Sequence, residues 1–191
     1  MAQNALEVSV GKPRAAGGIY SAEPTTTPPT DATTALGSTF KNLGYVSDDG
    51  LVNGIAIDTS DIIAWGGDKV LTVRTSRSET FAWTFIQTNA DVLAEVYGPD
   101  NVTETGGALT VLHNNKDLPA RLYVFEILLT GNRVKRIVVP NAQITEVGDV
   151  TYVDGDPIGY EVTLAAYPDD AGNTAYEYIA EVVTQTAQAA A

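Results

Sequence analysis

The sequence predicts a mainly β protein, an antiparallel β-sandwich or barrel with one flanking α-helix. The first observation is an alternation over residues 158–165, where the apolar side chains on one face are Ile158, Tyr160, Val162 and Leu164. A period of two is typical of a half-buried antiparallel strand. The second is turn chemistry, because pairs such as Gly131-Asn132 separate short apolar runs and tolerate positive φ. The third is one segment, residues 90–97, that combines a helical apolar stripe with signals at both ends.

The N-terminal part begins with an expected flexible arm over residues 1–17. Gly17-Gly18 then precede a short apolar run, Ile19-Tyr20, which indicates a first strand. Residues 22–34 are rich in Pro and Thr, which disfavour helix and favour extended chain. Two interpretations stay open: a disordered linker, or an arm that is mobile in the free subunit and ordered against a neighbouring one. The candidate inter-subunit residues of this arm are Pro24, Pro28, Pro29 and Asp31.

Residues 33–58 are expected to form a short helical turn followed by a strand. The helical turn, over 33–43, is indicated by three apolar side chains at helical spacing: Leu36, Phe40 and Leu43. The strand begins near residue 43, enters an Asp49-Gly50 turn and continues over 52–58. Two further strands are predicted at 69–75 and 79–87, and three aromatic side chains alternate along the second: Phe81, Trp83 and Phe85. Aromatics at this spacing are more often core than a platform for a ligand.

The well-marked helix covers residues 90–97. Asn89 can cap its N-terminus, Asp91 lies in its first turn, and Gly98-Pro99 ends it. Its apolar stripe, which must pack on the sheet, consists of Val92, Leu93, Val96 and Tyr97. After a loop over 101–107, residues 108–112 are expected to form an edge strand.

A β-meander over residues 121–166 is expected to organise the core. Its first strands, 122–129 and 133–139, are joined by a two-residue Gly131-Asn132 turn. Pro140 is expected to end the second strand, because proline cannot donate a ladder hydrogen bond. Strands resume over 142–147 and 150–153, with Gly148-Asp149 as a bulge between them.

The C-terminal part completes one predicted domain over residues 18–182. A turn over 154–157 leads into the last strand of the meander, and residues 175–183 are expected to form a final strand. Residues 183–191 are predicted to be a disordered tail. No stretch has the apolar length needed to span a bilayer, and the first residues lack signal-peptide features, so we expect no membrane insertion.

The composition excludes several classes of function. The 24 acidic and 11 basic residues give a net charge of −13, so we do not expect binding of nucleic acid through phosphate neutralisation. The acidic excess serves either solubility or a surface that repels a polyanion. Cysteine is absent, which excludes disulfides, thiol catalysis and cysteine-type zinc sites.

Motifs for catalysis or metal binding are missing from the sequence. It holds no nucleophile elbow, phosphate-binding loop or zinc-protease motif, and its one histidine, His113, lies in a polar stretch. Carboxylates are plentiful enough for a glycosidase-type pair, but nothing singles out two of them. Asp154-Gly155-Asp156 and residues 169–173 suggest calcium loops superficially, and ordinary turns explain both. We therefore expect no enzymatic activity, no cofactor and no metal.

Short motifs spread in order over residues 18–182 carry a family resemblance. They are Pro-Thr-Asp-Ala-Thr-Thr-Ala-Leu at 29–36, Leu-Gly-Tyr-Val-Ser-Asp-Asp-Gly-Leu at 43–51, Ala-Trp-Gly-Gly-Asp at 64–68, Val-Tyr-Gly at 96–98, Arg-Ile-Val-Val-Pro-Asn-Ala at 136–142, Glu-Val-Gly-Asp at 146–149, Ile-Gly-Tyr-Glu-Val-Thr-Leu at 158–164 and Gly-Asn-Thr at 172–174. Together these motifs resemble the major tail tube proteins of long-tailed, siphovirus-type phages, which share a lambda-like tail tube fold.

This resemblance implies a structural virion protein that self-assembles into stacked hexameric rings. The rings form the tail tube, assembled in the host cytoplasm, through which double-stranded DNA passes into the host without specific binding. The implied partners are further copies of the chain, the tape measure protein, the tail terminator and the tail tip proteins. The alternative from another class is a carbohydrate-binding β-sandwich module, which would be a monomer with an exposed aromatic platform.

The resemblance also implies that each subunit contributes strands to an inter-subunit β-barrel around the bore. The candidate strands lie within 43–58, 69–87 and 133–166. A negative bore would let DNA slide without sticking. The candidate lumen-facing residues, on or beside the meander strands, are Glu146, Asp149, Asp154, Asp156 and Glu161. Basic residues argue against a negative face on the strands at 69–87: Lys69, Arg74 and Arg77.

Overall fold

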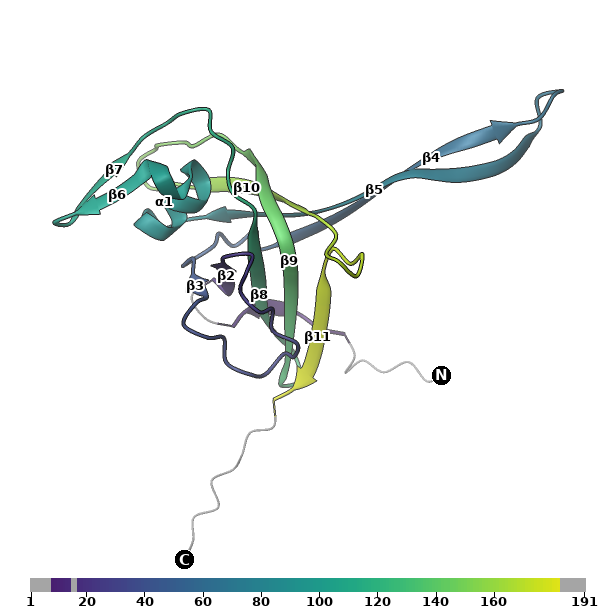
Figure 1. Ribbon diagram of the computed structural model, residues 1–191. Helices are drawn as coiled ribbons and strands as arrows, with labels where there is room; N and C mark the ends of the chain where they lie inside the picture. The colour runs from purple at the N-terminus through teal and green to yellow at the C-terminus, as the bar shows by residue number, and fades with distance from the viewer. Residues whose placement is uncertain (1–7, 15–16, 183–191) are drawn as a thin grey trace, which may run out of the picture.

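The computed structural model describes residues 8–14 and 17–182 and confirms a mainly antiparallel β fold with one α-helix (Figure 1). Its strands are β1 (Gly11–Pro13), β2 (Ile19–Ala22), β3 (Lys41–Asn42), β4 (Val52–Ile63), β5 (Lys69–Phe85), β6 (Val102–Thr105), β7 (Ala108–Val111), β8 (Arg121–Leu129), β9 (Arg133–Val147), β10 (Tyr160–Ala166) and β11 (Tyr176–Glu181). The helix α1 (Ala90–Tyr97) is followed by one 3-10 turn, Pro99–Asn101. Within the described residues, no helix is long and apolar enough to cross a membrane.

The main sheet has the strand order β3-β2-β8-β9-β10-β5-β4, with β1 on β8 and β11 on β9. The long strand β9 joins its two halves, because residues 133–138 pair with β11 and residues 142–147 pair with β10. The halves enclose a core to which β5 and α1 contribute Phe81, Trp83, Phe85, Val92, Leu93 and Val96. The consecutive antiparallel pairing of β8, β9 and β10 confirms the predicted meander.

Helix α1 forms where its caps predict. The Asn89 side chain accepts a hydrogen bond from the Val92 N–H at 2.9 Å, and the Gly98 N–H donates to the Ala94 carbonyl at 3.0 Å. The helical turn expected over 33–43 does not form. Its apolar side chains separate instead onto opposite faces of the sheet: Leu36 and Phe40 pack on the small cluster of Leu122, Val124 and Val138, whereas Leu43 enters the main core.

The prediction that Pro140 ends a strand is wrong, because β9 runs through it to Val147. Tyr123 pairs with Val139 but Arg121 pairs with Ala142, so β9 carries a bulge that contains Pro140. On its other side, Pro140 falls in the gap between the β11 and β10 pairings. Proline is tolerated at a bulge because no ladder hydrogen bond is required of its nitrogen there. The strand expected at 150–153 is also absent, since residues 148–159 form a loop.

The turn between β8 and β9 lies where it was predicted but is one residue longer. Leu129 pairs with Arg133, so Thr130, Gly131 and Asn132 form the connection. Gly131 (φ 77°) and Asn132 (φ 57°) both have left-handed backbones, which Gly and Asn adopt more easily than other residues. The extra residue shifts the pairing register by one and places Glu126 opposite Arg136.

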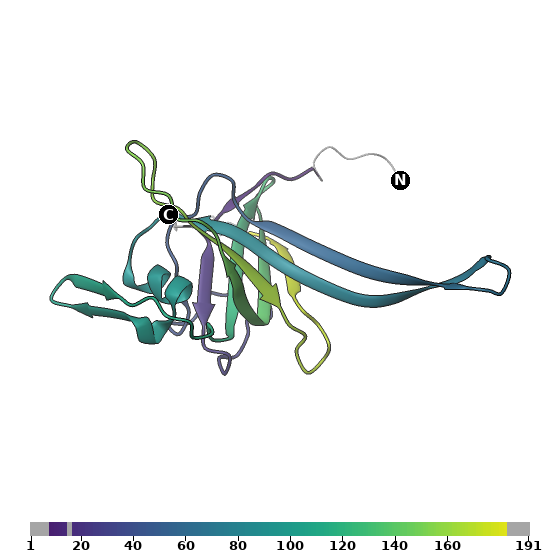
Figure 2. The ribbon, with the colours of Figure 1, turned by 90° about the horizontal axis from the view of Figure 1, so that it is seen from above.

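The largest departure from the prediction is a single long hairpin made by β4 and β5, which leaves the body of the molecule (Figures 1 and 2). The strands expected at 69–75 and 79–87 form one 17-residue strand, and β4 has 12 residues rather than the seven of 52–58. The strand expected from residue 43 is reduced to one bridge between Val46 and Phe85. The Asp49-Gly50 turn is present, with the Gly50 N–H donating to the Ser47 carbonyl at 3.1 Å.

Three short strands lie where none was expected, and one of them, β3, falls within the predicted helical turn 33–43. β1 falls within the predicted arm 1–17 and pairs with β8, while β6 falls within the predicted loop 101–107 and pairs with β7. The final strand β11 is confirmed. The rest of the predicted arm at residues 1–7 and 15–16, and the predicted tail at 183–191, lie outside the described residues.

Candidate assembly surface

The β4–β5 hairpin exposes both of its faces to solvent. Residues 69–78 of β5 are all exposed, and β4 is exposed at every position except the half-buried Gly54. The exposed large apolar side chains of the hairpin are Val52, Ile55, Ile57, Ile62, Ile63, Trp65, Val70, Leu71 and Val73. A two-stranded ribbon is marginally stable alone in water, and a contiguous exposed apolar patch marks an interaction site. The hairpin is therefore a surface suited to being covered by another molecule.

Polar contacts hold the two strands of this hairpin together. Asp61 accepts a hydrogen bond from the Thr72 hydroxyl at 2.8 Å and pairs with Lys69 at 2.9 Å. The Lys69 and Thr72 interactions hold the pKa of Asp61 below its usual range. The outer edge of β4 has no strand partner within the described residues, so its backbone groups can pair with a further strand.

Glu79 links the base of the hairpin to the loop that precedes β11 through hydrogen bonds. Its carboxylate accepts hydrogen bonds from Asn53 Nδ2 at 3.2 Å, from Arg77 at 3.0 Å and from the Thr174 hydroxyl. Burial favours the protonated acid, but the three donors outweigh burial and lower the pKa of Glu79. The ionised carboxylate therefore stabilises the angle at which the hairpin leaves the body.

We expect acid to weaken this contact. Because the folded pKa of Glu79 lies below its ordinary value of 4.5, the carboxylate stabilises the fold above that pH, and its contribution is lost as the pH falls through the lowered pKa. Urea denaturation between about pH 2 and 6 should show a steeper acid loss of unfolding free energy in the wild type than in Glu79→Gln. Glu104→Gln, at an exposed position on β6, should follow the wild type. Parallel curves for the wild type and Glu79→Gln would contradict the expectation.

The structure brings two of the five predicted lumen-facing carboxylates onto one sheet face. Glu146 on β9 pairs with Thr163 on β10, and Glu161 lies two residues from Thr163, so both project from the same side. Both are exposed, and their neighbours on that face of β5 and β10 are small: Thr80, Ala82, Thr84, Thr163 and Ala165. The opposite face of these strands is the core. This face is thus smooth, polar and acidic.

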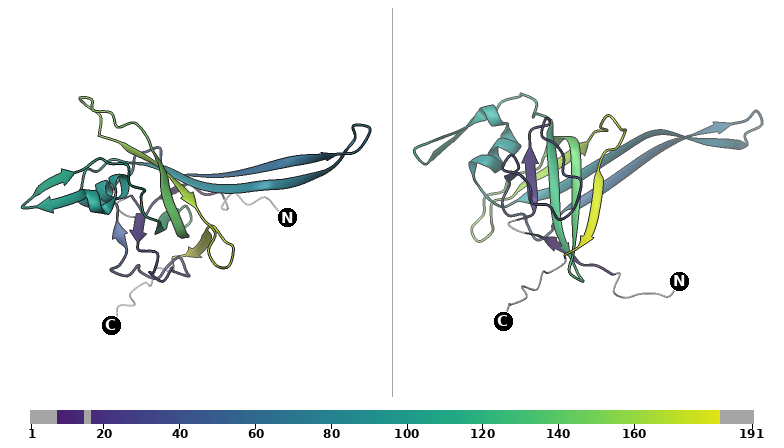
Figure 3. Two further views of the ribbon diagram at one scale, coloured as in Figure 1. Left: turned by 45° about the horizontal axis from the view of Figure 1, so that its top comes forward. Right: turned by 60° about the horizontal axis from the view of Figure 1, so that its bottom comes forward.

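The other three predicted carboxylates lie in the loop 148–159. Asp149, Asp154 and Asp156 are all exposed there. In Figure 3 the loop, drawn in yellow-green between β9 and β10, extends away from the hairpin tip. The loop begins beside Glu161, since the Gly148 N–H donates to the Glu161 carbonyl at 2.8 Å. The loop and the sheet face adjoin, and together they form an acidic region that carries the five carboxylates.

Arg136 holds the Pro/Thr-rich segment on the sheet of its own subunit. Its guanidinium is 1% exposed and donates hydrogen bonds at 2.7 Å to the carbonyls of both Asp31 and Thr34. Its Nε donates to the Glu126 carboxylate at 3.0 Å. The Asp31 carboxylate accepts the N–H groups of Thr34 and Thr33, each at 2.6 Å, which lower the pKa of Asp31 strongly.

The four candidate arm residues differ in exposure. Pro24 and Pro28 are exposed, whereas Pro29 and Asp31 are half-buried. An inter-subunit role for them stays a prediction, because no neighbouring subunit is present to test it. Sequence reasoning missed Arg136, although a signal existed. Glu126 and Arg136 are charges of opposite sign inside the two apolar runs that flank the Gly131-Asn132 turn, and buried charges are normally paired.

Two of the residues weighed for metal binding or catalysis, Asp169 and His113, make ordinary structural contacts. The Asp169 carboxylate accepts hydrogen bonds from the Tyr176 hydroxyl at 2.7 Å and from the N–H groups of Ala171 and Asn173 at 2.9 and 3.0 Å. Its oxygens therefore close a turn. The His113 ring packs on Tyr97 with 4.3 Å between ring centroids.

Comparison with known proteins identifies the family of the chain. A family model described as phage tail tube protein matches residues 1–191. Among solved structures, the chain is similar to the anti-feeding prophage tube-terminating cap, determined by cryo-electron microscopy, at 14% identity over 94% of this chain and 100% of that chain. The TM-score is 0.39, which is too low to support an inference. No curated protein matches the chain. The match over the full chain shows that this protein belongs to the phage tail tube protein family, a structural component of the virion.

Proposed function

We propose that the chain self-assembles into hexameric rings that stack into the tail tube, and that double-stranded DNA passes through the bore. The observation that carries this proposal is the β4–β5 hairpin, which exposes nine large apolar side chains and the free edge of β4. Further copies of the chain are the partners that cover it. The tape measure, terminator and tip proteins are the expected partners inside and at the ends of the tube.

The hairpin suits assembly between copies that are not related by a two-fold axis. It projects away from its own body, so its apolar tip can meet only another molecule (Figure 2). A contact between a projecting element and a different surface of the next copy is heterologous, and repeated heterologous contacts build rings or filaments. A tube of stacked rings needs both kinds of contact, because contacts within a ring close on themselves and contacts between rings repeat along the tube axis.

Four strands of each subunit supply the wall of the bore in this proposal: residues 142–147 of β9, then β10, β5 and β4. Six copies give 6 × 4 = 24 strands. At about 4.8 Å between strands and a tilt of about 45°, the barrel has a backbone diameter near 50 Å. Subtracting a side-chain layer of about 5 Å on each wall leaves about 40 Å, which is wider than a DNA duplex.

The acidic sheet face then points into the bore. Six subunits of net charge −13 carry 6 × (−13) = −78 per ring. Carboxylates such as Glu146 and Glu161 repel phosphates and keep the duplex near the axis, whereas lysines would bind it through counterion release. The short threonine and alanine side chains of this face do not reach the base edges of a duplex that stays near the axis.

Shortening the hairpin tests the proposal. Replacing residues 56–78 with a two-residue Asn-Gly turn keeps Ile55 opposite Glu79 while removing most of the exposed apolar surface. We expect the wild type to form rings or tubes in electron micrographs at high concentration, and the shortened chain to stay a folded monomer by light scattering. The matched control replaces residues 104–109 of the β6–β7 hairpin with Asn-Gly and should still assemble. A monomeric wild type, or a shortened chain that assembles normally, would contradict the proposal.

A further inference from the structure

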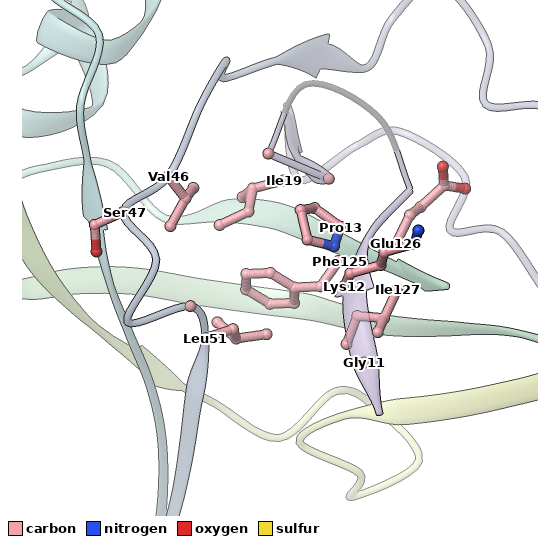
Figure 4. Close-up of a pocket in the computed structure, with 13 residues that line it drawn as sticks. Gly11, Lys12, Pro13, Ile19, Val46, Ser47, Leu51, Phe125, Glu126 and Ile127 are labelled. Atoms are coloured by element: carbon pink, nitrogen blue, oxygen red, sulfur yellow. The ribbon is translucent and has the colours of Figure 1, made fainter. Parts of the chain in front are cut away.

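An apolar cavity lies beside the point where the hairpin leaves the body (Figure 4). It has a volume of about 220 Å³ and is lined mainly by apolar side chains of four segments: Pro13, Ile19, Val46, Leu51, Phe125 and Ile127. The Phe125 ring lies at its centre, with Leu51 and Val46 on one side and Pro13 and Ile127 on the other. An apolar cavity of about 150 Å³ accepts a benzene ring, so this one has room for a larger aromatic group.

The tip of the hairpin presents such a group. Trp65 is 107% exposed, so its indole is not covered by any other residue that the structure describes. The turn that carries it is well defined, because the Ala64 N–H donates to the Asp68 carbonyl at 2.8 Å and the Gly67 N–H donates to the Ala64 carbonyl at 3.0 Å. Order that exists before binding lowers the entropic cost of docking. An isolated, fully exposed tryptophan on an ordered turn has the properties of an interface anchor.

We propose that Trp65 of one subunit inserts into this cavity of a second copy, which deepens the self-assembly proposed above and rests on it. Trp65 cannot fill the cavity of its own subunit. Leu51 lines the cavity and immediately precedes the 12-residue β4, which at about 3.4 Å per residue carries the tip about 40 Å away. The contact is therefore heterologous. It places the cavities of two successive copies at most about 40 Å apart, which is the distance from cavity to tip within one subunit.

Charge complementarity supports a second copy as the occupant. Lys12 is exposed on the rim of the cavity, and Asp68 is exposed three residues after Trp65. Docking the indole brings a carboxylate to a rim that carries an ammonium group. Such a rim pair contributes orientation and specificity more than affinity, while burial of the indole supplies most of the binding.

Substitutions at the tip measure the contribution of the indole. We expect Trp65→Ala to raise the subunit concentration needed for assembly about 30-fold, which corresponds to about 2 kcal/mol. Trp65→Phe keeps an aromatic ring and should recover part of this loss. Leu112→Ala, at an exposed apolar position away from the hairpin, should assemble like the wild type. Light scattering with electron microscopy as a check on tube formation gives the readout. A Trp65→Ala chain that assembles at wild-type concentrations overturns the inference and leaves the proposed self-assembly standing, whereas a wild type that never assembles overturns both.

Mixing two variants tests the inserted Trp65 and the receiving cavity separately. Leu51→Trp fills the cavity, while Trp65→Ala lacks the insert, so neither variant should assemble alone at the lowest concentration at which the wild type assembles. Their mixture should form a heterodimer that does not grow, because only one complementary contact is available. Assembly of either variant alone at that wild-type concentration would count against the inference.

Cysteine cross-linking gives a test that does not depend on the folding of Leu51→Trp. The chain has no cysteine, so Asp68→Cys and Lys12→Cys introduce the only thiols. Under oxidising conditions we expect disulfide-linked dimers when the two variants are mixed, and little linkage in either alone. Linkage of Asp68→Cys to itself as fast as in the mixture would show a tip-to-tip contact and overturn the inference.

Discussion

Replacing Arg136 with methionine is expected to lower the free energy of unfolding of the subunit by about 3 kcal/mol. The guanidinium is buried against the Glu126 carboxylate, and removing one partner of a buried ion pair typically costs about 3–5 kcal/mol. Arg14 lies 3.4 Å from Glu126 and still offers a partly exposed cation, so we expect the lower end of that range. Urea denaturation measures the change.

The same substitution also tests what holds the Pro/Thr-rich segment. In Arg136→Met the carbonyls of Asp31 and Thr34 lose their donor, so amide exchange around residues 29–36 should become faster. The control is the double variant Glu126→Leu with Arg136→Met, which replaces the ion pair by apolar side chains and should regain most of the stability. Its segment should still exchange fast, because the carbonyls remain without the guanidinium. A loss of less than about 1 kcal/mol in the single variant would show that the pair is not structurally important.

Reversing the charge of the five predicted lumen-facing residues should slow genome ejection while leaving tube formation intact. The substitutions to lysine at Glu146, Asp149, Asp154, Asp156 and Glu161 add ten charges and change the subunit from −13 to −3. Lysines facing the duplex attract phosphates and release counterions, which retards sliding. The retardation should weaken as the salt concentration rises. Ejection kinetics of phage that carry the variant give the measurement.

Two partial variants locate the effect within the acidic region. The Glu146 and Glu161 pair projects from the sheet, whereas Asp149, Asp154 and Asp156 lie in the loop 148–159. If the sheet lines the bore, Glu146→Lys with Glu161→Lys should retard ejection more per charge than the three loop substitutions. Asp100→Lys with Glu104→Lys, near α1, should leave ejection unchanged. Wild-type kinetics in the five-fold variant, or a tube structure with these carboxylates on its outer surface, would refute the assignment.

Local signals were sufficient for much of the fold. The alternation in β10, the cap of α1 and the left-handed residues at 131–132 depend on side chains within a few positions, and all three are confirmed. The family was recognisable for a related reason, because its motifs are short stretches of consecutive residues. The sequence alone therefore determined the fold class, the meander, the helix and the family.

The tertiary structure decided how segments distant in the chain meet. Pro140 fits within β9 because a bulge and a change of neighbouring strand coincide at that residue. The side chains Leu36, Phe40 and Leu43 have helical spacing, yet they pack on opposite faces of one sheet. The pairing of Glu126 with Arg136 depended on a turn one residue longer than expected, and a one-residue shift changes every pair along two strands.

The β4–β5 hairpin shows most clearly which part of the structure could not be predicted from the sequence. The predicted strands at 69–75 and 79–87 left the polar residues 76–78 between them. Residues 69–78 of β5 lie outside the core, so this part of the strand needs no alternation of buried and exposed side chains. Its apolar side chains are exposed, so they add nothing to the core of their own chain, which is why we propose that they form an interface between chains. The sequence alone determined that these residues favour β-structure, and only the three-dimensional arrangement showed that they lie outside the core of their own subunit.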